Sequence, residues 1–326
     1  MKPLRLTMAR TLAGSLPPLI AARGAHWIYP ADRAWHDAYQ FRLRARTGSF
    51  YTGDTRDVHA RACAIYGYFD WRLLAAARYF CKSGETIVEV GANVGTETIG
   101  LADIVGRRGR VYAFEPEPSN ATQLRRAMSS AGLSQVEVID KAVSDRVGHV
   151  TFVPGPDRES GSGHIGTGDG PGDDGSLRVD CLTLDSFFAD KGPVRLLVMD
   201  AEGAEVGIVR GGGQLLRRDQ PVVIVEARDE HLRRFGADLA TLEAELRAHG
   251  YQVYELARLG LTPASADQNQ HTGRRTVFET PAKWGRNWLA LPPALADQAG
   301  RAHRHLLWCG LVPCIRGLNP LAKRLA

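Results

Sequence analysis

A glycine-containing turn after a buried apolar segment is the part of this sequence best suited to hold a charged ligand. Residues 86–98 read TIVEVGANVGTET. Gly91 allows the chain to turn sharply where it leaves a strand, and Gly95 allows a ligand to approach the backbone at the start of the next helix. The free N–H groups at that helix N-terminus suit a carboxylate. The turn therefore predicts a binding site for a ligand that carries a carboxylate.

The same turn does not match a dinucleotide site. A GxGxxG fingerprint starting at Gly91 would need glycine at positions 93 and 96, where Asn93 and Thr96 stand. Glu89 precedes the first glycine by two residues and would repel a pyrophosphate, but it suits an ammonium group. An amino-acid moiety carries both an ammonium and a carboxylate, so such a ligand fits better.

A second carboxylate stands at the end of the next apolar run, RVYAF at 110–114, where Glu115 is followed by Pro116. A carboxylate at the tip of the second strand can accept hydrogen bonds from both hydroxyls of a ribose. The alternative is a solvated loop glutamate. Its position relative to the glycine turn favours the nucleoside-binding role.

These residues require a parallel sheet to bring them together. Short apolar runs at 86–90, 110–114, 136–139, 195–199 and 222–226 predict buried strands, and the intervening segments 96–106, 119–131, 204–217 and 238–249 predict helices. Gly132 is placed to end the second helix. The segments 251–256 and 287–291 lack a helix between them and predict a closing antiparallel pair. The fold class is therefore α/β, a doubly wound and mostly parallel sheet.

Further candidates for proton transfer follow the fourth strand and lie in a glycine-rich stretch. Asp200 and Glu202 stand at the strand's carboxyl end. This position predicts contact with a cofactor or an acceptor; the alternative is a pair of acids at the start of a helix, stabilised by its dipole. His164 lies in the glycine-rich segment 154–176, which is either a mobile loop over an acceptor pocket or disordered. Glu226, at the end of the fifth strand, is a weaker candidate. We expect a base among Asp200, Glu202 and His164.

Four runs in order, VEVGANVG, GRVYAFEPEPSN, VIDKAVSD and LLVMDAEGAE, resemble the FkbM-type methyltransferases over residues 84–292. The resemblance implies a class I, Rossmann-like, seven-stranded fold, S-adenosylmethionine as cofactor, and methylation chiefly of hydroxyl groups on sugars or polyketides. By position it implies that Glu89, Gly91, Ala92, Asn93, Gly95 and Thr98 hold the methionine end. It likewise implies that Glu115 and Pro116 hold the ribose, and that Ala142 and Val143 lie along the adenine.

Three functions remain open at this point. The first is an O-methyltransferase acting on a sugar, a glycan precursor or a polyketide-like molecule. The second is an N-methyltransferase, although the sequence after the fourth strand lacks the Asn/Asp-Pro-Pro-aromatic run of enzymes that methylate bases. The third is a subunit that binds S-adenosylmethionine without turnover.

Composition sets the outer limits. The 326 residues divide into a mostly helical N-terminal segment (1–80), a cofactor-binding domain (81–292) and a basic tail (293–326). A net charge of +5 without a central basic block gives no reason to expect nucleic acid. Five cysteines without a CxxC pair predict buried thiols in a reducing compartment and no metal.

The two ends raise the question of membrane contact. The uncharged segment 11–22 imitates a signal peptide but contains two prolines, so we expect a cytoplasmic protein. The apolar segment 306–315 is too short to span a bilayer. With its basic flanks it either packs against the core, which Gly310 and Pro313 favour by spoiling an amphipathic helix, or rests on a membrane surface.

Overall fold

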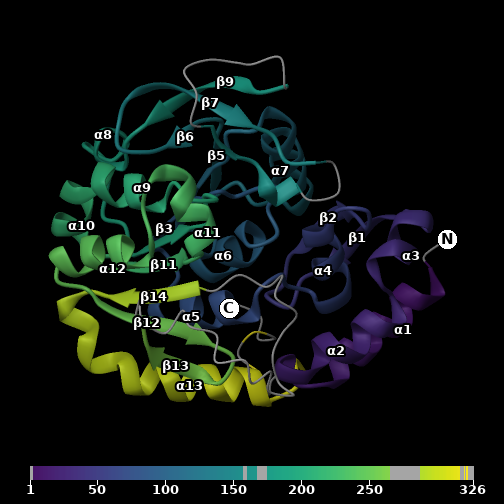
Figure 1. Ribbon diagram of the computed structural model, residues 1–326. Helices are drawn as coiled ribbons and strands as arrows, with labels where there is room; N and C mark the ends of the chain where they lie inside the picture. Colours follow the sequence, from purple (N-terminus) through teal and green to yellow (C-terminus); the bar gives the residue numbers. More distant parts are fainter. Residues whose placement is uncertain are drawn as a thin grey trace.

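The computed structural model describes residues 3–156, 160–166, 175–264, 287–315, 319 and 321. Its centre is an eight-stranded sheet in the order β13-β12-β14-β11-β10-β3-β4-β5 (Figure 1). The strands are β3 (Thr86–Val90), β4 (Arg110–Phe114), β5 (Val136–Ile139), β10 (Leu196–Met199), β11 (Val222–Glu226), β12 (Gln252–Ala257), β13 (Gly260–Pro263) and β14 (Asn287–Leu291).

All seven strands expected from the sequence are present. Strands β3, β4, β5, β10 and β11 pair in parallel, and β14 inserts antiparallel between β11 and β12. The expected number of seven was wrong by one, because β13 adds an antiparallel edge strand to β12. Its four residues end in Pro263, and so short a segment leaves little apolar pattern to read.

Alternate residues along the strands face two separate cores. Ile87, Val198 and Ile224 pack with helices α5 (Trp71–Phe80) and α6 (Thr98–Val105) on one face. Val88 and Val225 pack with α9 (Glu205–Gly211) and α12 (Leu239–Ala248) on the other. Burial on both faces explains why these strands read as continuous apolar runs.

The helices of the domain follow the expected order. They are α6 (Thr98–Val105), α7 (Pro118–Ala131), α8 (Leu184–Phe187), α9 (Glu205–Gly211), α10 (Gly213–Asp219), α11 (Asp229–Leu232) and α12 (Leu239–Ala248), with the 3₁₀ turn η2 (Arg233–Phe235). Gly132 ends α7 in the left-handed conformation, as expected. The single helix expected over 204–217 is two helices, which break at Gly212.

A second, four-stranded sheet lies beside the first in the order β6-β9-β7-β8. Its strands are β6 (Ala142–Val143), β7 (Gly148–Val153), β8 (His164–Ile165) and β9 (Leu177–Leu182). The expectation that 154–176 holds no regular structure was wrong for residues 160–165. There the chain forms the 3₁₀ turn η1 (Ser160–Ser162) and pairs β8 with β7. Residues 167–174 of that stretch lie outside the described part.

The N-terminal segment is mostly helical but contains a hairpin that the sequence pattern did not indicate. Its helices are α1 (Leu4–Ser15), α2 (Pro18–Ile28), α3 (Ala31–His36), α4 (Val58–Tyr66) and α5 (Trp71–Phe80), and its strands are β1 (Gln40–Arg44) and β2 (Phe50–Asp54). The hairpin buries Phe41 and Tyr51, whose ring centroids lie 6.0 Å apart. The Tyr51 hydroxyl donates to the carbonyl of Val94 at 3.0 Å, which ties the hairpin to the turn after β3.

The C-terminal segment packs against the core. The 3₁₀ turn η4 (Pro293–Gln298) leads into α13 (Ala299–Leu311), which lies along the lower edge of the molecule against α5 and β13 (Figure 1). It buries Ala302, Leu306 and Cys309. Gly310 and Pro313 were expected to spoil an amphipathic helix here; the helix passes through Gly310 and ends at Leu311, before Pro313. The basic residues at 316, 323 and 324 lie outside the described part.

The described chain bears on two other expectations. All five cysteines are buried free thiols. Within the described ranges, no helix combines the length and hydropathy needed to cross a bilayer.

Candidate active site

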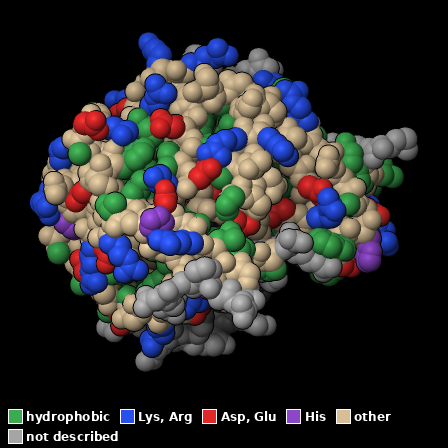
Figure 2. Space-filling view, turned by 90° about the horizontal axis from the view of Figure 1, so that it is seen from above, with side chains coloured by type: hydrophobic (Ala, Val, Ile, Leu, Met, Phe, Trp, Pro, Cys, Tyr) green, Lys and Arg blue, Asp and Glu red, His purple; other side chains and the backbone are tan. Residues whose placement is uncertain are grey.

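A cavity of 1120 Å³ opens at the carboxyl ends of β3, β4, β10 and β11. Ligands collect at this edge in open α/β sheets. Residues of α4, η1 and β8 complete its wall. Figure 2 shows acidic side chains set back in a hollow near the middle of this face, with Lys and Arg side chains around it.

The turn after β3 is shaped by two residues with positive φ. Gly91 has φ +84°, and a Cβ at this position would lie 1.8 Å from the carbonyl oxygen of Asp200 on the neighbouring strand end. Asn93 has φ +49°, and its N–H donates to Glu115 Oε2 at 2.7 Å. Gly91, Ala92 and Asn93 all line the cavity. The turn therefore brings the ends of β3, β4 and β10 together.

Glu115 lies where the second strand was expected to place it. It is buried at the cavity wall, and its Oε1 accepts the N–H of Glu117 at 2.9 Å. Burial raises its pKa to about 7, although the hydrogen bonds from the N–H groups of Glu117 and Asn93 oppose this. Pro116 lines the cavity beside it. The carboxylate is held rigidly at the tip of β4.

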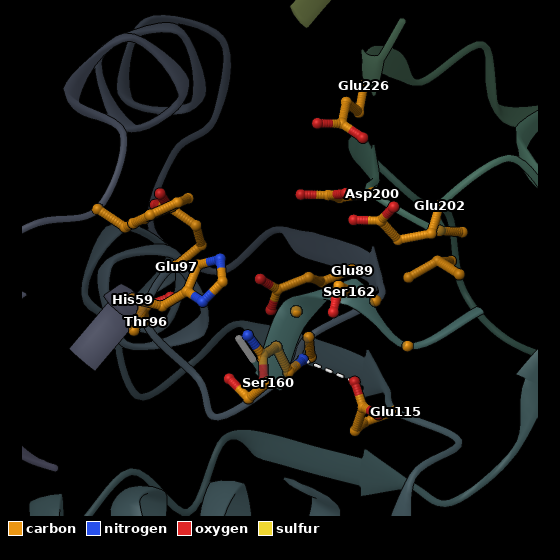
Figure 3. Close-up of a pocket in the computed structure, with 18 of the residues that line it drawn as sticks. His59, Glu89, Thr96, Glu97, Glu115, Ser160, Ser162, Asp200, Glu202 and Glu226 are labelled. Atoms are coloured by element: carbon orange, nitrogen blue, oxygen red, sulfur yellow. Dashed lines mark hydrogen bonds between the residues drawn. The ribbon is translucent and has the colours of Figure 1, made fainter. Parts of the chain in front are cut away.

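Glu89 is buried at the centre of the cavity floor (Figure 3). Its Oε2 accepts a hydrogen bond from the Thr98 hydroxyl at 2.6 Å. Burial raises the pKa of Glu89 to about 8, and Glu115 adds to the rise. Thr98 is fully buried, so it orients Glu89 and does not face the cavity.

Gly95 also lies off the cavity wall. A Cβ there would approach Leu124 at 2.5 Å and Met128 at 3.0 Å, both on α7. The absence of a side chain thus permits close packing of the turn against that helix. The expectation that Gly95 allows a ligand to approach is not what its surroundings indicate. Ala142 and Val143 are buried on β6 and line the cavity, on the side expected for the adenine.

Asp200 and Glu202 both line the cavity at the end of β10. The Asp200 side chain is open to the cavity, yet its pKa is raised well above the usual range by its enclosure and by the nearby Glu226 and Glu202. Glu202 has φ +53°, in the turn before α9. The helix-start role belongs instead to Glu205, whose Oε1 accepts the N–H of Ala201 at 2.9 Å.

The sequence interpretation missed a histidine beside these carboxylates. His231 Nδ1 on α11 lies 2.9 Å from Glu202 Oε2 and 3.3 Å from Glu226 Oε2. Burial lowers the pKa of His231, but the two glutamates outweigh this and raise it to about 9. Glu226, the weaker candidate, is therefore part of the site. No motif marked His231, because it follows the fifth strand on a four-residue helix.

Two more residues join from the opposite wall. Figure 3 shows His59 and Glu97 across the cavity from Asp200, Glu202 and Glu226. Glu97 stood in the glycine turn but received no role, and His59 lies on α4 in the segment without motifs. His164 lines the cavity from β8, with Nδ1 3.3 Å from the carbonyl of Ser162.

The η1 turn is held over this part of the site by Ser160. Its hydroxyl donates to Asp57 Oδ2 at 2.6 Å, and its carbonyl accepts from Asn120 Nδ2 at 3.0 Å. Asp57 caps α4, and Asn120 lies on α7. A segment of the glycine-rich stretch thus contributes a fixed part of the wall.

The cavity wall holds several buried polar atoms that make no hydrogen bond within the described chain. They are His59 Nδ1, Asn93 Oδ1, Glu97 Oε2, Glu226 Oε2 and His231 Nδ1. Buried polar atoms are nearly always hydrogen-bonded in native proteins. Acceptors with no donor, together with the carboxylates Glu89 and Glu115, fit the ammonium and hydroxyl groups of a sulfonium nucleoside such as S-adenosylmethionine.

Solved structures with similar folds include three methyltransferase-related proteins. Methyltransferase FkbM from Methylobacillus flagellatus KT has 17% identity and a TM-score of 0.44; the match covers 88% of this chain and 58% of that protein's length. An S-adenosylmethionine-dependent O-methyltransferase from Thermotoga maritima has 12% identity, covering 68% and 63% of the two chains, with a TM-score of 0.37. Fibrillarin from Aeropyrum pernix, with bound S-adenosyl-L-methionine, has 14% identity, covering 84% and 86%, with a TM-score of 0.36. These similarities are too distant to indicate an acceptor.

No curated protein matches the chain at a significant level. The model of the methyltransferase FkbM domain matches residues 89–253, from the glycine turn to β12. This range contains the ends of β3, β4, β10 and β11, which form the cavity floor. Because the match spans half of the sequence, the chain belongs to the FkbM methyltransferase domain family.

Proposed function

We propose that this protein transfers the methyl group of S-adenosylmethionine to a hydroxyl of a sugar, a glycan precursor or a polyketide-like molecule. Membership of the family makes S-adenosylmethionine the expected cofactor and the class I methyltransferase fold the expected architecture. The observation that carries the choice of a hydroxyl acceptor is the group of carboxylates, led by Asp200, at the cavity wall beside the glycine turn.

In this proposal the cofactor lies along the ends of β3 and β4. Glu89 and the turn at Gly91, Ala92 and Asn93 hold its amino-acid end. Glu115 with Pro116 holds the ribose, and Ala142 with Val143 borders the adenine. Gly95 and Thr98 support this site without touching the cofactor. Gly95 allows the turn to pack on α7, and Thr98 donates a hydrogen bond to Glu89. The bound cofactor supplies an electrophilic methyl group.

The residues of the chain then have to orient the acceptor and receive its proton. A hydroxyl is a weak nucleophile, so a base within hydrogen-bond reach speeds the transfer. Asp200 is the best placed, because its side chain is open to the cavity at the end of β10, beside the glycine turn. Glu202 extends this surface, and His164 is the alternative base from the β8 side.

The size of the cavity supports a second ligand beside the cofactor. Its 1120 Å³ exceeds the roughly 300–1000 Å³ typical of a pocket for one small molecule. Residues of the N-terminal segment, among them Trp35, Arg56, His59 and Arg61, line part of the wall. We assign the selection of the acceptor to this wall, since it provides polar and aromatic groups outside the family match.

The test is transfer of a labelled methyl group from S-adenosylmethionine to fractionated glycan and small-molecule extracts. We expect label in a methyl ether, which withstands mild alkali. Asp200→Asn should lower the rate by about 100-fold or more, with S-adenosylhomocysteine affinity unchanged. Glu137→Gln, an exposed carboxylate on β5, serves as the matched control and should retain full activity.

Other outcomes are distinguishable. Label recovered only in amines would replace the proposal with N-methylation. Tight cofactor binding without label in any fraction would favour a non-catalytic subunit. Full activity in His164→Ala would remove His164 as a base, and full activity in Asp200→Asn would remove Asp200.

A further inference from the structure

Three side chains on the Asp200 side of the cavity present ligand atoms to a common point. They are Glu202 in the turn after β10, Glu226 at the end of β11 and His231 on α11. Their nearest oxygen and nitrogen atoms all lie within 4.8 Å of one another. Each side chain comes from a different element, so the sheet edge itself holds the group together.

The two most buried members each have one side-chain atom without a hydrogen bond in the described chain. The side chains of Glu226 and His231 are each 8% exposed. Neither Glu226 Oε2 nor His231 Nδ1 makes a hydrogen bond within the described chain, although they lie 3.3 Å apart. Buried polar atoms in native proteins nearly always have a partner, so these two atoms point to a ligand that the described chain does not itself provide.

The separations fit ligands that share one ion. Bonds of about 2.1 Å at right angles place neighbouring ligand atoms about 3 Å apart, and a tetrahedral angle places them slightly further apart. The Nδ1 atom of His231 lies 2.9 Å from Glu202 Oε2 and 3.3 Å from Glu226 Oε2. These two separations match ligands of one divalent cation, and the third pair, Glu202 and Glu226, lies within 4.8 Å.

The charge around the group also favours a cation. Asp200 and Glu205 lie close enough to interact electrostatically with Glu226. Arg228 is the nearby cation, with Nη1 4.0 Å from Glu226 Oε1, but its Nε and Nη2 donate to Glu230. Oε1 of Glu226 thus faces Arg228, whereas Oε2 faces His231.

We propose that Glu202, Glu226 and His231 bind one divalent transition-metal ion, of the Mn²⁺ or Zn²⁺ type, at the wall of the cavity. An imidazole with two carboxylates suits these ions better than Ca²⁺, which prefers an all-oxygen shell. Because all three residues line the cavity, the remaining coordination positions face the space for the acceptor. Binding of the ion goes beyond the proposed function; a role in holding the acceptor's oxygen atoms rests on that function.

The test uses the full chain after treatment with a chelator. Titration with MnCl₂, followed by the electron paramagnetic resonance signal of free Mn²⁺, should show one saturable site per chain. Calorimetry with ZnCl₂ should give the same stoichiometry. Both His231→Gln and Glu226→Gln should weaken binding by about tenfold or more. Glu245→Gln, a carboxylate on α12 outside the cavity, is the matched control and should bind as the parent does.

Circular dichroism of each variant distinguishes a loss of metal binding from a loss of folding. The two variants change ligands on different elements, so each tests the site separately. No saturable binding at sub-millimolar metal, or metal binding as tight as the parent's in His231→Gln and Glu226→Gln, would overturn the proposal. Competition between Mn²⁺ and S-adenosylmethionine would assign the group to the cofactor's ammonium and would also overturn it. Methyl transfer that persists with excess chelator would leave the proposed function intact while removing the metal from it.

Discussion

The closest backbone approach in the site gives a direct test of how the strand ends are held together. Gly91 has φ +84°, and a Cβ there would lie 1.8 Å from the carbonyl oxygen and 2.8 Å from the carbonyl carbon of Asp200. The N–H of Asp200 also donates to the carbonyl of Val90 at 3.0 Å. In Gly91→Ala the ends of β3 and β10 must therefore separate.

The loss of folding stability in Gly91→Ala has two parts. A non-glycine residue in the left-handed region costs about 1–2 kcal/mol. Overpacking costs about 1–3 kcal/mol, and the upper end applies because the obstructing atoms belong to the backbone of a paired strand. We expect Gly91→Ala to lower the free energy of unfolding by about 3–5 kcal/mol, a large part of the roughly 5–15 kcal/mol typical of a native protein.

Gly84→Ala separates the two parts. Gly84 has φ +94°, close to that of Gly91, but nothing lies within 4 Å of its added Cβ. This variant should lose only the conformational cost of about 1–2 kcal/mol. Urea unfolding measures both variants, and S-adenosylhomocysteine affinity should fall only in Gly91→Ala. Equal losses of stability in the two variants would refute the reasoning that the Asp200 carbonyl blocks this position.

Three further predictions follow from the same structure. Burial raises the pKa of Glu115 to about 7, so the affinity for S-adenosylhomocysteine, measured by calorimetry, should rise about tenfold between pH 6 and pH 8. Glu115→Gln should bind more weakly and lose that rise. The same pH dependence of affinity in Glu115→Gln as in the parent would contradict the assignment. Glu89 has a pKa of about 8 in the folded protein, above the usual glutamate value of 4.5, so between these two pH values the folded state holds a proton that the unfolded state releases. The ligand-free protein should therefore lose stability as pH rises from about 5 to 8, by up to about 1.4 kcal/mol per pH unit, and Glu89→Gln should flatten this dependence in urea unfolding. A Cβ on Gly310 would lie 2.6 Å from the buried Trp71 ring, so Gly310→Ala should lower the midpoint of thermal unfolding. Gly300 lies in the same helix, and its added Cβ would meet only an arginine atom at 3.9 Å, so Gly300→Ala should raise the midpoint slightly through helix propensity. A higher midpoint in both variants would disprove the contact with Trp71.

The sequence allowed candidate site residues to be placed at strand ends, where a polar side chain directly follows an apolar run. Glu115 could be placed because a carboxylate directly follows an apolar run and a parallel sheet gathers such positions at one edge. Asp200 and Glu202 followed from the same rule. The strands were readable because burial on both faces leaves uninterrupted apolar runs.

The residues that were missed depend on contacts distant in the sequence. His59 reaches the cavity from α4, and His231 from a short helix after β11, so neither has a local pattern that marks it. The hairpin of β1 and β2 has only one or two inward residues per strand, too few for a clear alternation. Gly95 was expected to face a ligand, whereas a Cβ there would meet Leu124 and Met128 of α7; sequence alone does not distinguish a glycine that faces a ligand from one that faces a helix.

The core on the α5 and α6 face extends well past the range matched by the family model. Buried side chains from Leu6 in α1 to Leu306 in α13 and Leu321 belong to the same cluster as Ile87 and Val198 of the central sheet. Cutting the gene at the boundaries of the recognised segment would leave this apolar face uncovered. A piece suitable for expression and crystallisation therefore has to include these flanking segments, and mutations in them will act on folding as strongly as those in the matched range.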